Sequence, residues 1–174
     1  LSSFLPTDVG KIAFTSGGSD ANDTAVKAAW YYSNTLGHTK RKKILARHKA
    51  YHGVTGLAAS CSGLPGLHKT FGGTSSTTDM PLPGFIHLTC PHQYRQAAPE
   101  EDEEAFAQRL ANELEEVILK EGPETIVAMI AEPLMGAGGV MPPPRSYFSK
   151  VQKVLTKHGI LLIADEVVCG FGRL

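Results

Sequence analysis

Hydrophobic residues are distributed along the chain in two ways, as short uninterrupted runs and as longer stretches in which they recur every three or four positions. The runs predict strands at Ile12 to Thr15, Ile44 to Ala46, Ile126 to Ala131 and Ile160 to Ala164. Because these strands are apolar throughout and alternate with helical stretches, the pattern indicates a parallel sheet covered on both sides. The predicted architecture is α/β, a mainly parallel sheet between two layers of helices.

The first predicted helix begins at Ser19, whose side chain can cap it, and ends at Gly37. Its predicted buried face consists of Ala21, Ala25, Ala28, Ala29, Tyr32 and Leu36. The stretch from Gly63 to Gln96 is rich in Gly, Pro, Ser and Thr, so it is predicted to be irregular. Within it, Gly72 to Thr78 is predicted to be an exposed loop.

A second helix is predicted after Pro99, with an acidic first turn at positions 100–104 that complements the helix dipole. It ends at Gly122-Pro123, and its apolar face consists of Phe106, Leu110, Leu114, Val117 and Ile118. The acidic cluster is therefore interpreted as the start of a helix rather than as a metal site. The last predicted helix, Ser146 to His158, has an apolar face of Phe148, Val151, Val154 and Leu155.

Composition narrows the class of protein. Seventeen Lys and Arg balance 17 Asp and Glu, and 42% of the residues are hydrophobic. This content suffices for one core and argues against a disordered chain. The balanced charge argues against a nucleic-acid partner, and no apolar stretch reaches the length of about 18 residues that indicates a membrane helix.

The cysteines and the chain ends indicate context. Cys61, Cys90 and Cys169 are too few and too scattered for a disulfide framework, which favours a soluble protein of a reducing compartment, either the cytoplasm or the mitochondrial matrix. The chain begins at Leu1 and stops just after its last apolar run, so we expect it to be an internal fragment of a longer protein.

Candidate chemistry lies after the predicted strands, where open α/β sheets bind ligands. Ser16-Gly17-Gly18-Ser19 follows the first strand, and its glycines and helix-start amides could hold an anion. The alternative is a tight turn with a serine cap. Asp20 would repel a phosphate and is expected to face away.

Tyr51 and His52 follow the second predicted strand. The tyrosine ring could lie against a flat ligand, or it could be a core aromatic with a hydrogen-bonded hydroxyl. His48 and His52 have the i, i+4 spacing of metal ligands but do not lie on a predicted helix. Cys90 and His92 could also bind a metal, but the sequence has no second pair of ligands at a spacing that would complete a zinc site with them. A zinc site is therefore not favoured, and no metal is predicted.

Two strand ends carry carboxylates. Asp165 and Glu166 follow the most apolar strand, and adjacent residues point to opposite faces, so one of them should face the ligand crevice. Glu132 ends another strand ahead of the glycine-rich segment 136–139. An anion site, an aromatic ring and a buried carboxylate together suit a cationic heteroaromatic ring that carries a phosphate, such as pyridoxal phosphate.

Four segments, in order, resemble the class III (omega) aminotransferases, which are fold type I pyridoxal-phosphate enzymes. They are Phe14-Thr-Ser-Gly-Gly-Ser-Asp-Ala-Asn-Asp23, Tyr51-His-Gly53, Ala131-Glu-Pro-Leu-Met-Gly-Ala-Gly-Gly-Val140 and Ala164-Asp-Glu-Val-Val-Cys-Gly-Phe-Gly-Arg173. The intervening sequence is similar to the subgroup that uses pyruvate or glyoxylate as amino acceptor, which includes 4-aminobutyrate transaminases.

The resemblance implies roles for individual residues. Gly18 and Ser19 would bind the cofactor phosphate, and Tyr51 and Val167 would cover the two faces of the ring. Asp165 would be the catalytic acid that pairs with the pyridine nitrogen. Glu132 would support the polar network beside the ring, and His52 would have a structural role beside Tyr51.

The resemblance also implies what lies outside the chain. The Schiff-base lysine of the family would follow Asp165 at a distance beyond Leu174, so residues 1–174 would be part of the cofactor-binding large domain and inactive alone. The substrates would be an amine and a 2-oxo acid, and the complete enzyme would be a homodimer. The alternatives are another fold type I activity, such as a decarboxylase or mutase, and a non-catalytic homologue.

Two features depart from the pattern of the family. Residues 16–20 read Ser-Gly-Gly-Ser-Asp where the family usually has Asn-Ser-Gly-Ser-Glu, so the acidic side chain at position 20 is shorter than in the family. Residues 72–79 resemble an insertion.

Overall fold

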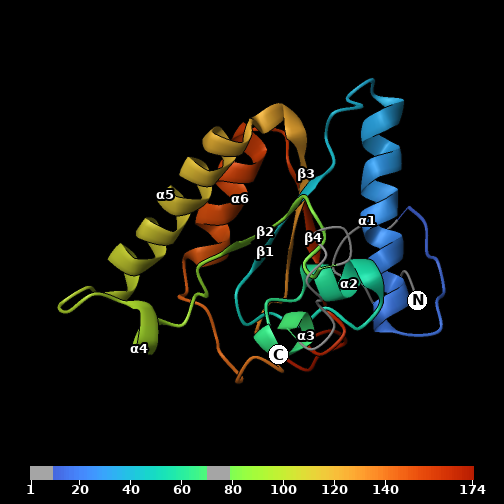
Figure 1. Ribbon diagram of the computed structural model, residues 1–174. Coiled ribbons are helices and arrows are strands. Elements are labelled where there is room, and N and C mark those ends of the chain that lie inside the picture. The colour runs from blue at the N-terminus through green and yellow to red at the C-terminus, as the bar shows by residue number, and fades with distance from the viewer. Residues whose placement is uncertain (1–9, 70–78) are drawn as a thin grey trace.

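The computed structural model describes residues 10–69 and 79–174 of the chain. Its described strands form one parallel sheet in the order β2-β1-β3-β4 (Figure 1). The strands are β1 (Lys43–Arg47), β2 (Phe85–Leu88), β3 (Ile126–Ala131) and β4 (Leu161–Ala164). The predicted α/β class and parallel sheet are confirmed.

Helices cover both faces of the sheet. Helices α5 (Glu103–Glu121) and α6 (Tyr147–Lys157) lie on one face, and α1 (Gly18–Thr35) and α2 (Gly56–Cys61) lie on the other (Figure 1). Three short helices, α3 (Pro65–Lys69), α4 (Gln93–Gln96) and the 3₁₀ helix η2 (Pro123–Thr125), lie in the connections. The predicted three-layer arrangement is therefore confirmed.

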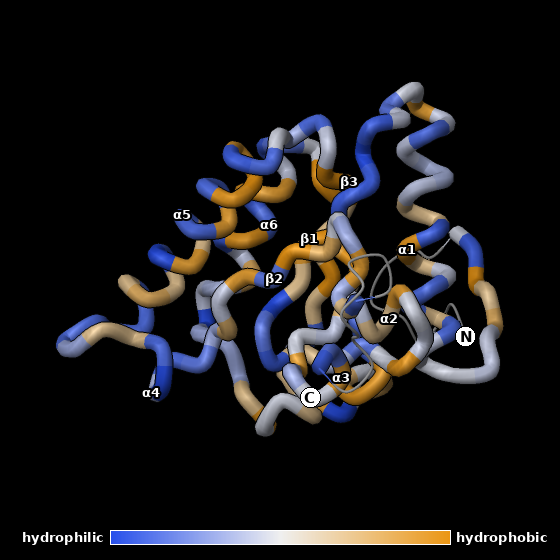
Figure 2. The backbone as a smooth tube through the Cα atoms, viewed as in Figure 1, coloured by the Kyte–Doolittle hydropathy of each residue, from blue (hydrophilic) through white to orange (hydrophobic). Residues whose placement is uncertain are grey.

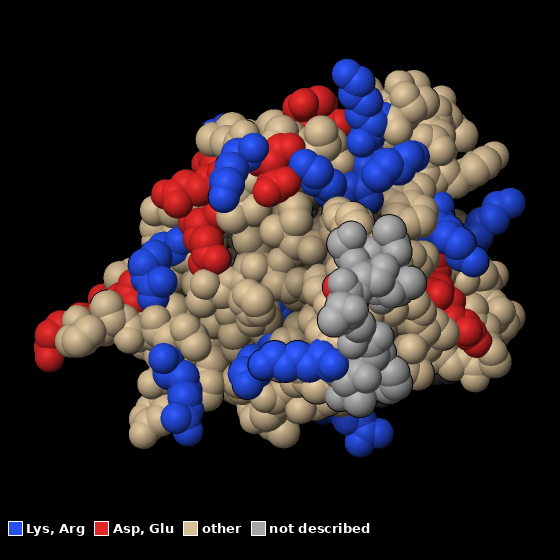
Figure 3. All heavy atoms as spheres, in the orientation of Figure 1, with Lys and Arg blue, Asp and Glu red and all other residues tan. Residues whose placement is uncertain are grey.

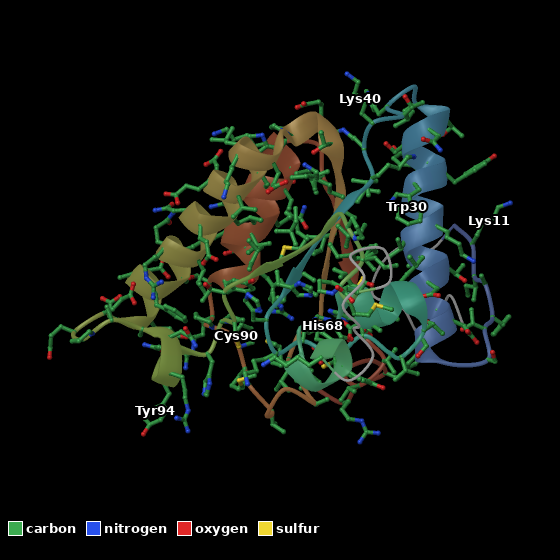
Figure 4. All side chains as sticks on the ribbon, in the orientation of Figure 1. Lys11, Trp30, Lys40, His68, Cys90 and Tyr94 are labelled. Atoms are coloured by element: carbon green, nitrogen blue, oxygen red, sulfur yellow. The ribbon has the colours of Figure 1, made fainter. Side chains whose placement is uncertain are left out.

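The sheet separates two hydrophobic cores because neighbouring strand residues point to opposite faces. Leu45 and Met129 pack against α5 and α6, whereas Ile44 and Ala128 pack against α1 and α2. Figure 2 shows this hydrophobic material in the central strands, with hydrophilic positions on the outer sides of the helices. Trp30 is partly buried and packs against the core that faces α1 and α2, and its indole N–H donates to the Lys42 carbonyl at 2.9 Å (Figure 4).

Helix α5 begins within the predicted acidic segment but later than predicted: it starts at Glu103, and Glu100 has φ of +64° and is not helical. Asp102 is its N-cap residue, and one carboxylate oxygen accepts a hydrogen bond from the Ala105 amide at 2.7 Å. The helix stops at Gly122, where φ is +86°. Acidic residues of α5 also pair with lysines of α6, as in Lys150–Glu104 at 2.7 Å, and Figure 3 shows both charge signs interspersed over this side.

Asp102→Ala is expected to lower the free energy of unfolding by about 1 kcal/mol, because the Ala105 amide loses its cap. The measurement is chemical unfolding of the full-length protein. Glu116→Ala, on an exposed turn of the same helix, is the control and should change stability by less than about 0.5 kcal/mol. Equal losses in the two variants would contradict the capping role.

The N-terminal part of the prediction is wrong in two respects. Ile12 to Thr15 forms no strand: it lies outside the sheet, and Phe14 is 82% exposed. Ser19 is not the cap of α1, because Gly17 occupies that position and makes no side-chain bond. An apolar run shows only that a segment disfavours water, whereas a strand also needs a neighbour with which to pair.

The buried face of α1 is rotated from the predicted one. Its buried residues are Asn22, Val26, Ala29 and Ser33, whereas Ala28, Tyr32 and Leu36 are exposed. Asn22 and Ser33 are polar although they are buried, so a prediction from apolar residues alone identifies the wrong face of the helix. The predicted end is right, because Gly37 follows the helix with φ of +80°.

The region predicted to be irregular contains α3, α4 and the edge strand β2, which pairs with β1 from Ile44–Phe85 to Arg47–Leu88. The predicted loop at 72–78 and most of the apparent insertion at 72–79 lie outside the described residues.

Strand β4 pairs with β3 on one side only, so it is half-exposed and not fully buried as predicted. Within the described ranges, no helix is long and apolar enough to cross a membrane.

Candidate functional site

The carboxyl ends of β1, β3 and β4 meet the start of α1 at one edge of the sheet, on the lower side of Figure 1. A cavity of about 210 Å³ opens there. Its lining residues are Gly18, Ser19, Asn22, Tyr51, His52, Gly53, Glu132, Asp165, Val167 and Val168. The structure thus brings together all of the residues that the sequence proposed for the cofactor, from segments far apart in the chain.

Asp165 is the buried carboxylate of this cavity, with 5% of its surface exposed. Its Oδ2 atom accepts a hydrogen bond from Asn22 Nδ2 at 2.8 Å and lies 2.7 Å from His52 Nδ1. Its Oδ1 atom accepts from the Val167 amide at 3.2 Å. Glu166 is exposed, so only one of the two adjacent acids faces the crevice, as strand alternation predicts.

Burial by itself raises the pKa of Asp165, but its neighbours reverse the shift. The hydrogen bond and charge of His52, with the donors of Asn22 and Val167, hold the pKa of this carboxyl below its ordinary value. Asp165 therefore remains ionised at neutral pH. A buried anion with these donors can attract a cationic group of a ligand.

Glu132 is also buried, and its carboxylate connects two loops. One oxygen accepts from the Tyr51 amide at 3.1 Å, and the other accepts from the Gly136 amide at 2.9 Å. The Glu132 carbonyl accepts from Arg47 Nη2 at 2.7 Å, and the Arg47 side chain is completely buried. Glu132 thus connects the backbone at Tyr51, which lines the cavity, to the backbone at Gly136.

The first turn of α1 lies at the cavity, which Gly18 and Ser19 line. The first hydrogen bond of the helix runs from the Ala21 amide to the Gly17 carbonyl, and within the described part of the chain the amides of residues 18–20 have no acceptor. A Cβ at Gly18 would lie 3.1 Å from the Val167 side chain. Asp20 is exposed and accepts a hydrogen bond from Ser16, so it faces away as expected. This arrangement suits an anion.

Ser19 contributes its side chain to the local fold. Its hydroxyl oxygen accepts a hydrogen bond from the Val54 amide at 3.0 Å. The loop after β1 therefore lies against the start of α1. Gly53 makes this close approach possible, because its φ is +128° and a Cβ there would lie 2.4 Å from Ser19 Oγ.

Tyr51 lies at the mouth of the cavity and is 37% exposed. Among the described residues, no hydrogen bond to its hydroxyl is found. These observations do not support a core aromatic with a bonded hydroxyl. A half-exposed ring that lines the cavity is available to a flat ligand.

The remaining histidines and cysteines lie elsewhere. The His48 ring stacks on His87 at 5.6 Å, so it does not share a site with His52. The Cys90 thiol is buried and lies 3.8 Å from the sulfur of each of two methionines, Met135 and Met141. Figure 4 shows Cys90 between α4 and the sheet. In the described part of the chain, no cluster of three His, Cys, Asp or Glu residues has the geometry of a metal site.

Sequence reasoning missed the contacts within the site. Asn22 was not a candidate, although it follows Gly18 by four positions and therefore shares a face of α1 with it. His52 was expected only to support Tyr51, whereas its ring contacts Asp165. Polar residues at helical spacing from the glycine turn were the available signal.

Comparisons with known proteins agree with the geometry. The sequence family described as "Aminotransferase class-III" matches residues 1–174. A rice protein (Oryza sativa subsp. indica) named probable gamma-aminobutyrate transaminase 3, mitochondrial, is 58% identical over 174 residues, which are 100% of this chain and 33% of that protein. A tomato protein (Solanum lycopersicum) named gamma aminobutyrate transaminase 3, chloroplastic, is 57% identical over 100% of this chain and 32% of its own length.

A solved structure is similar over almost the whole chain. The crystal structure of the omega transaminase from Pseudomonas jessenii in complex with PMP has a TM-score of 0.93 and 56% identity, and the match covers 98% of this chain and 36% of that one. The chain spans about a third of the length of the curated relatives that it matches. The family match over all residues and the high identities confirm the resemblance in the sequence, and the chain belongs to the class III aminotransferases.

Proposed function

We propose that this chain is the cofactor-binding part of the large domain of an enzyme that moves an amino group from an amine or omega-amino acid to a 2-oxo acid such as pyruvate or glyoxylate. Class III aminotransferases use pyridoxal 5'-phosphate. The observation that carries the proposal is the buried, ionised Asp165 in the same cavity as the first turn of α1, at Gly18 and Ser19. Relatives named gamma-aminobutyrate transaminases support the substrate class.

The residues present fit this cofactor. The amides at Gly18 and Ser19 can bind its phosphate, because the N-terminus of an 18-residue helix attracts anions. Asp165 can hold the proton of the ring nitrogen, because its lowered pKa keeps it ionised beside a cationic N–H. Tyr51 and Val167 can cover the two ring faces and exclude water.

Other residues hold this arrangement in place. Glu132 keeps the Tyr51 backbone at the cavity through its amide, and Asn22 and His52 contact Asp165. When bound, pyridoxal phosphate supplies an electron sink for the negative charge that develops on the substrate carbon. The proton that Asp165 retains on the ring nitrogen keeps this sink strong.

Amino transfer by the full-length protein tests the proposal. Purified enzyme with pyridoxal phosphate should transfer the amino group of 4-aminobutyrate or alanine to pyruvate or glyoxylate. A protein that binds the cofactor but transfers no amino group would overturn the proposed reaction. The decarboxylase, mutase and non-catalytic alternatives are not favoured, because the relatives compared above are named transaminases.

The assembly and compartment belong to the same proposal. We expect a homodimer, as the family resemblance implies. The buried free thiols of Cys61, Cys90 and Cys169 support a reducing compartment, either cytoplasm or mitochondrial matrix. Size-exclusion chromatography with light scattering would reveal the dimer, and a monomeric active enzyme would contradict it.

Tyr51 supplies a further prediction. Tyr51→Phe should retain cofactor affinity, because the ring stays. Tyr51→Ala should lose about 1–3 kcal/mol of binding free energy, the contribution of an aromatic side chain that stacks on a nucleic-acid base. The measurement is cofactor titration of the full-length protein, with thermal melting to monitor the fold. Normal affinity in folded Tyr51→Ala would remove Tyr51 from the binding site.

A further inference from the structure

The two oxygens of Asp165 are in different environments. Oδ2 contacts two side-chain donors, Asn22 Nδ2 at 2.8 Å and His52 Nδ1 at 2.7 Å. Among the described residues, Oδ1 has one donor, the Val167 amide, at 3.2 Å, which is the long end of the range for such bonds. Since each carboxylate oxygen can accept about two hydrogen bonds, Oδ2 is saturated and Oδ1 has an acceptor position left.

The two donors on Oδ2 are themselves held in place. Asn22 uses its second amide hydrogen to donate to the His52 carbonyl at 2.7 Å, so both hydrogens are engaged. The His52 amide donates to Ser62 Oγ at 2.8 Å, and Ser62 in turn donates to the Ala58 carbonyl at 2.9 Å. The His52 and Asp165 side chains are 0% and 4% exposed. This network leaves Asp165 little freedom to rotate.

The direction of the hydrogen bonds follows from the charge of Asp165. An ionised carboxylate only accepts, so His52 carries a proton on Nδ1 and donates it. Both contacts on Oδ2 therefore favour the charged form, which agrees with the lowered pKa of Asp165.

We infer that Asn22 and His52 are positioning residues that occupy Oδ2 of Asp165 and leave Oδ1 as the oxygen that binds the cationic ring N–H of the cofactor. The inference rests on the proposed function and deepens it, because it assigns the two sides of one carboxylate to different partners. Neither residue needs to touch the cofactor for this role.

The variants separate positioning from general support of the fold. Asn22→Asp keeps the shape but places an acceptor and a negative charge beside Oδ2. His52→Leu removes the donor, whereas His52→Asn keeps an N–H at the position of Nδ1. Asn34→Asp makes the same chemical change as Asn22→Asp at an exposed position of the same helix, and serves as the control.

The measurement is the apparent dissociation constant of the full-length protein for pyridoxal phosphate and for its analogue in which CH replaces the ring nitrogen. Asn22→Asp and His52→Leu should weaken binding of pyridoxal phosphate by about 10-fold or more, as expected for a charge-assisted hydrogen bond. Their affinity for the analogue should remain close to that of the wild type, because the analogue has no N–H for Oδ1. His52→Asn should restore most of the loss, and Asn34→Asp should resemble the wild type.

An equal loss of affinity for both molecules would show that Asn22 and His52 only support the fold, and would overturn the inference. Unchanged binding of pyridoxal phosphate in folded Asn22→Asp and His52→Leu would also overturn it. If Asn22→Asp does not fold, the comparison between His52→Leu and His52→Asn decides. A wild-type protein that binds neither molecule would instead overturn the proposed function.

Discussion

Asp165→Asn in the full-length enzyme is expected to weaken cofactor binding by about 1.5–3 kcal/mol, the contribution of a hydrogen bond to a charged group. Asparagine is isosteric, so Asn22 and His52 retain a partner and the fold should persist. Turnover should fall further than affinity, because a neutral amide does not hold the proton on the ring nitrogen. Cofactor titration and single-turnover kinetics measure the two effects separately.

Glu166→Gln is the matched control. It removes the same charge from the neighbouring residue, which is exposed and lines no part of the cavity. Wild-type affinity and turnover are expected. If instead Asp165→Asn has normal turnover and Glu166→Gln is impaired, the two assignments must be exchanged.

Gly53→Ala is expected to lower the free energy of unfolding by about 2–4 kcal/mol, through backbone strain and overpacking. Gly53 has φ of +128°, and a Cβ there would lie 2.4 Å from Ser19 Oγ and 2.9 Å from the Ser19 Cα atom. Since the second contact is with backbone, the loop must move away from α1. The hydrogen bond between Val54 and Ser19 should break, and phosphate binding should weaken.

Gly56→Ala provides a control with the opposite sign. Gly56 begins α2, and no atom lies within 4 Å of a Cβ built there. Alanine restricts the unfolded chain, so this variant should gain about 0.4–1 kcal/mol. Urea unfolding of the full-length protein measures both variants. A folded, fully stable Gly53→Ala would mean that the loop does not approach α1 this closely.

The elements that the sequence predicted well are those whose hydrophobic pattern and end signals agree. Helix α5 has an acidic start, an apolar face and a glycine at its end, and the structure confirms each. Strand β3 is buried at every position, as its uninterrupted apolar run predicts. Local sequence signals are enough to predict these elements because their contacts with the rest of the fold favour the same secondary structure.

The failures occur where tertiary contacts decide. Strand β2 is only four residues long, and its pairing with β1 rather than its composition makes it a strand. Helix α1 buries Asn22 because Asp165 and His52 supply partners for its amide. Neither partner is near Asn22 in the sequence, so the four-residue spacing from Gly18 could place Asn22 on the face of α1 that carries the glycine turn but could not identify its hydrogen-bond partners.

The membership of the cavity was easier to predict than its internal contacts. Gly18, Tyr51, Glu132 and Asp165 each follow a predicted strand or open a helix, so fold class alone brings them to one edge. Distances between side chains depend on loop conformations such as that of Gly53. The sequence pattern therefore does not predict these distances.

The separation of Asn22 and Asp165 along the chain has a consequence for biosynthesis. Asn22 leaves the ribosome 143 residues before its partner. At translation rates of about 5–20 residues per second, Asn22 waits roughly 7–29 seconds before the carboxylate emerges, and His52, which precedes it by 113 residues, waits roughly 6–23 seconds. During part of this time, the edge of β1 that later pairs with β3 is open. That edge is exposed to incorrect strand pairing until β3 has been made.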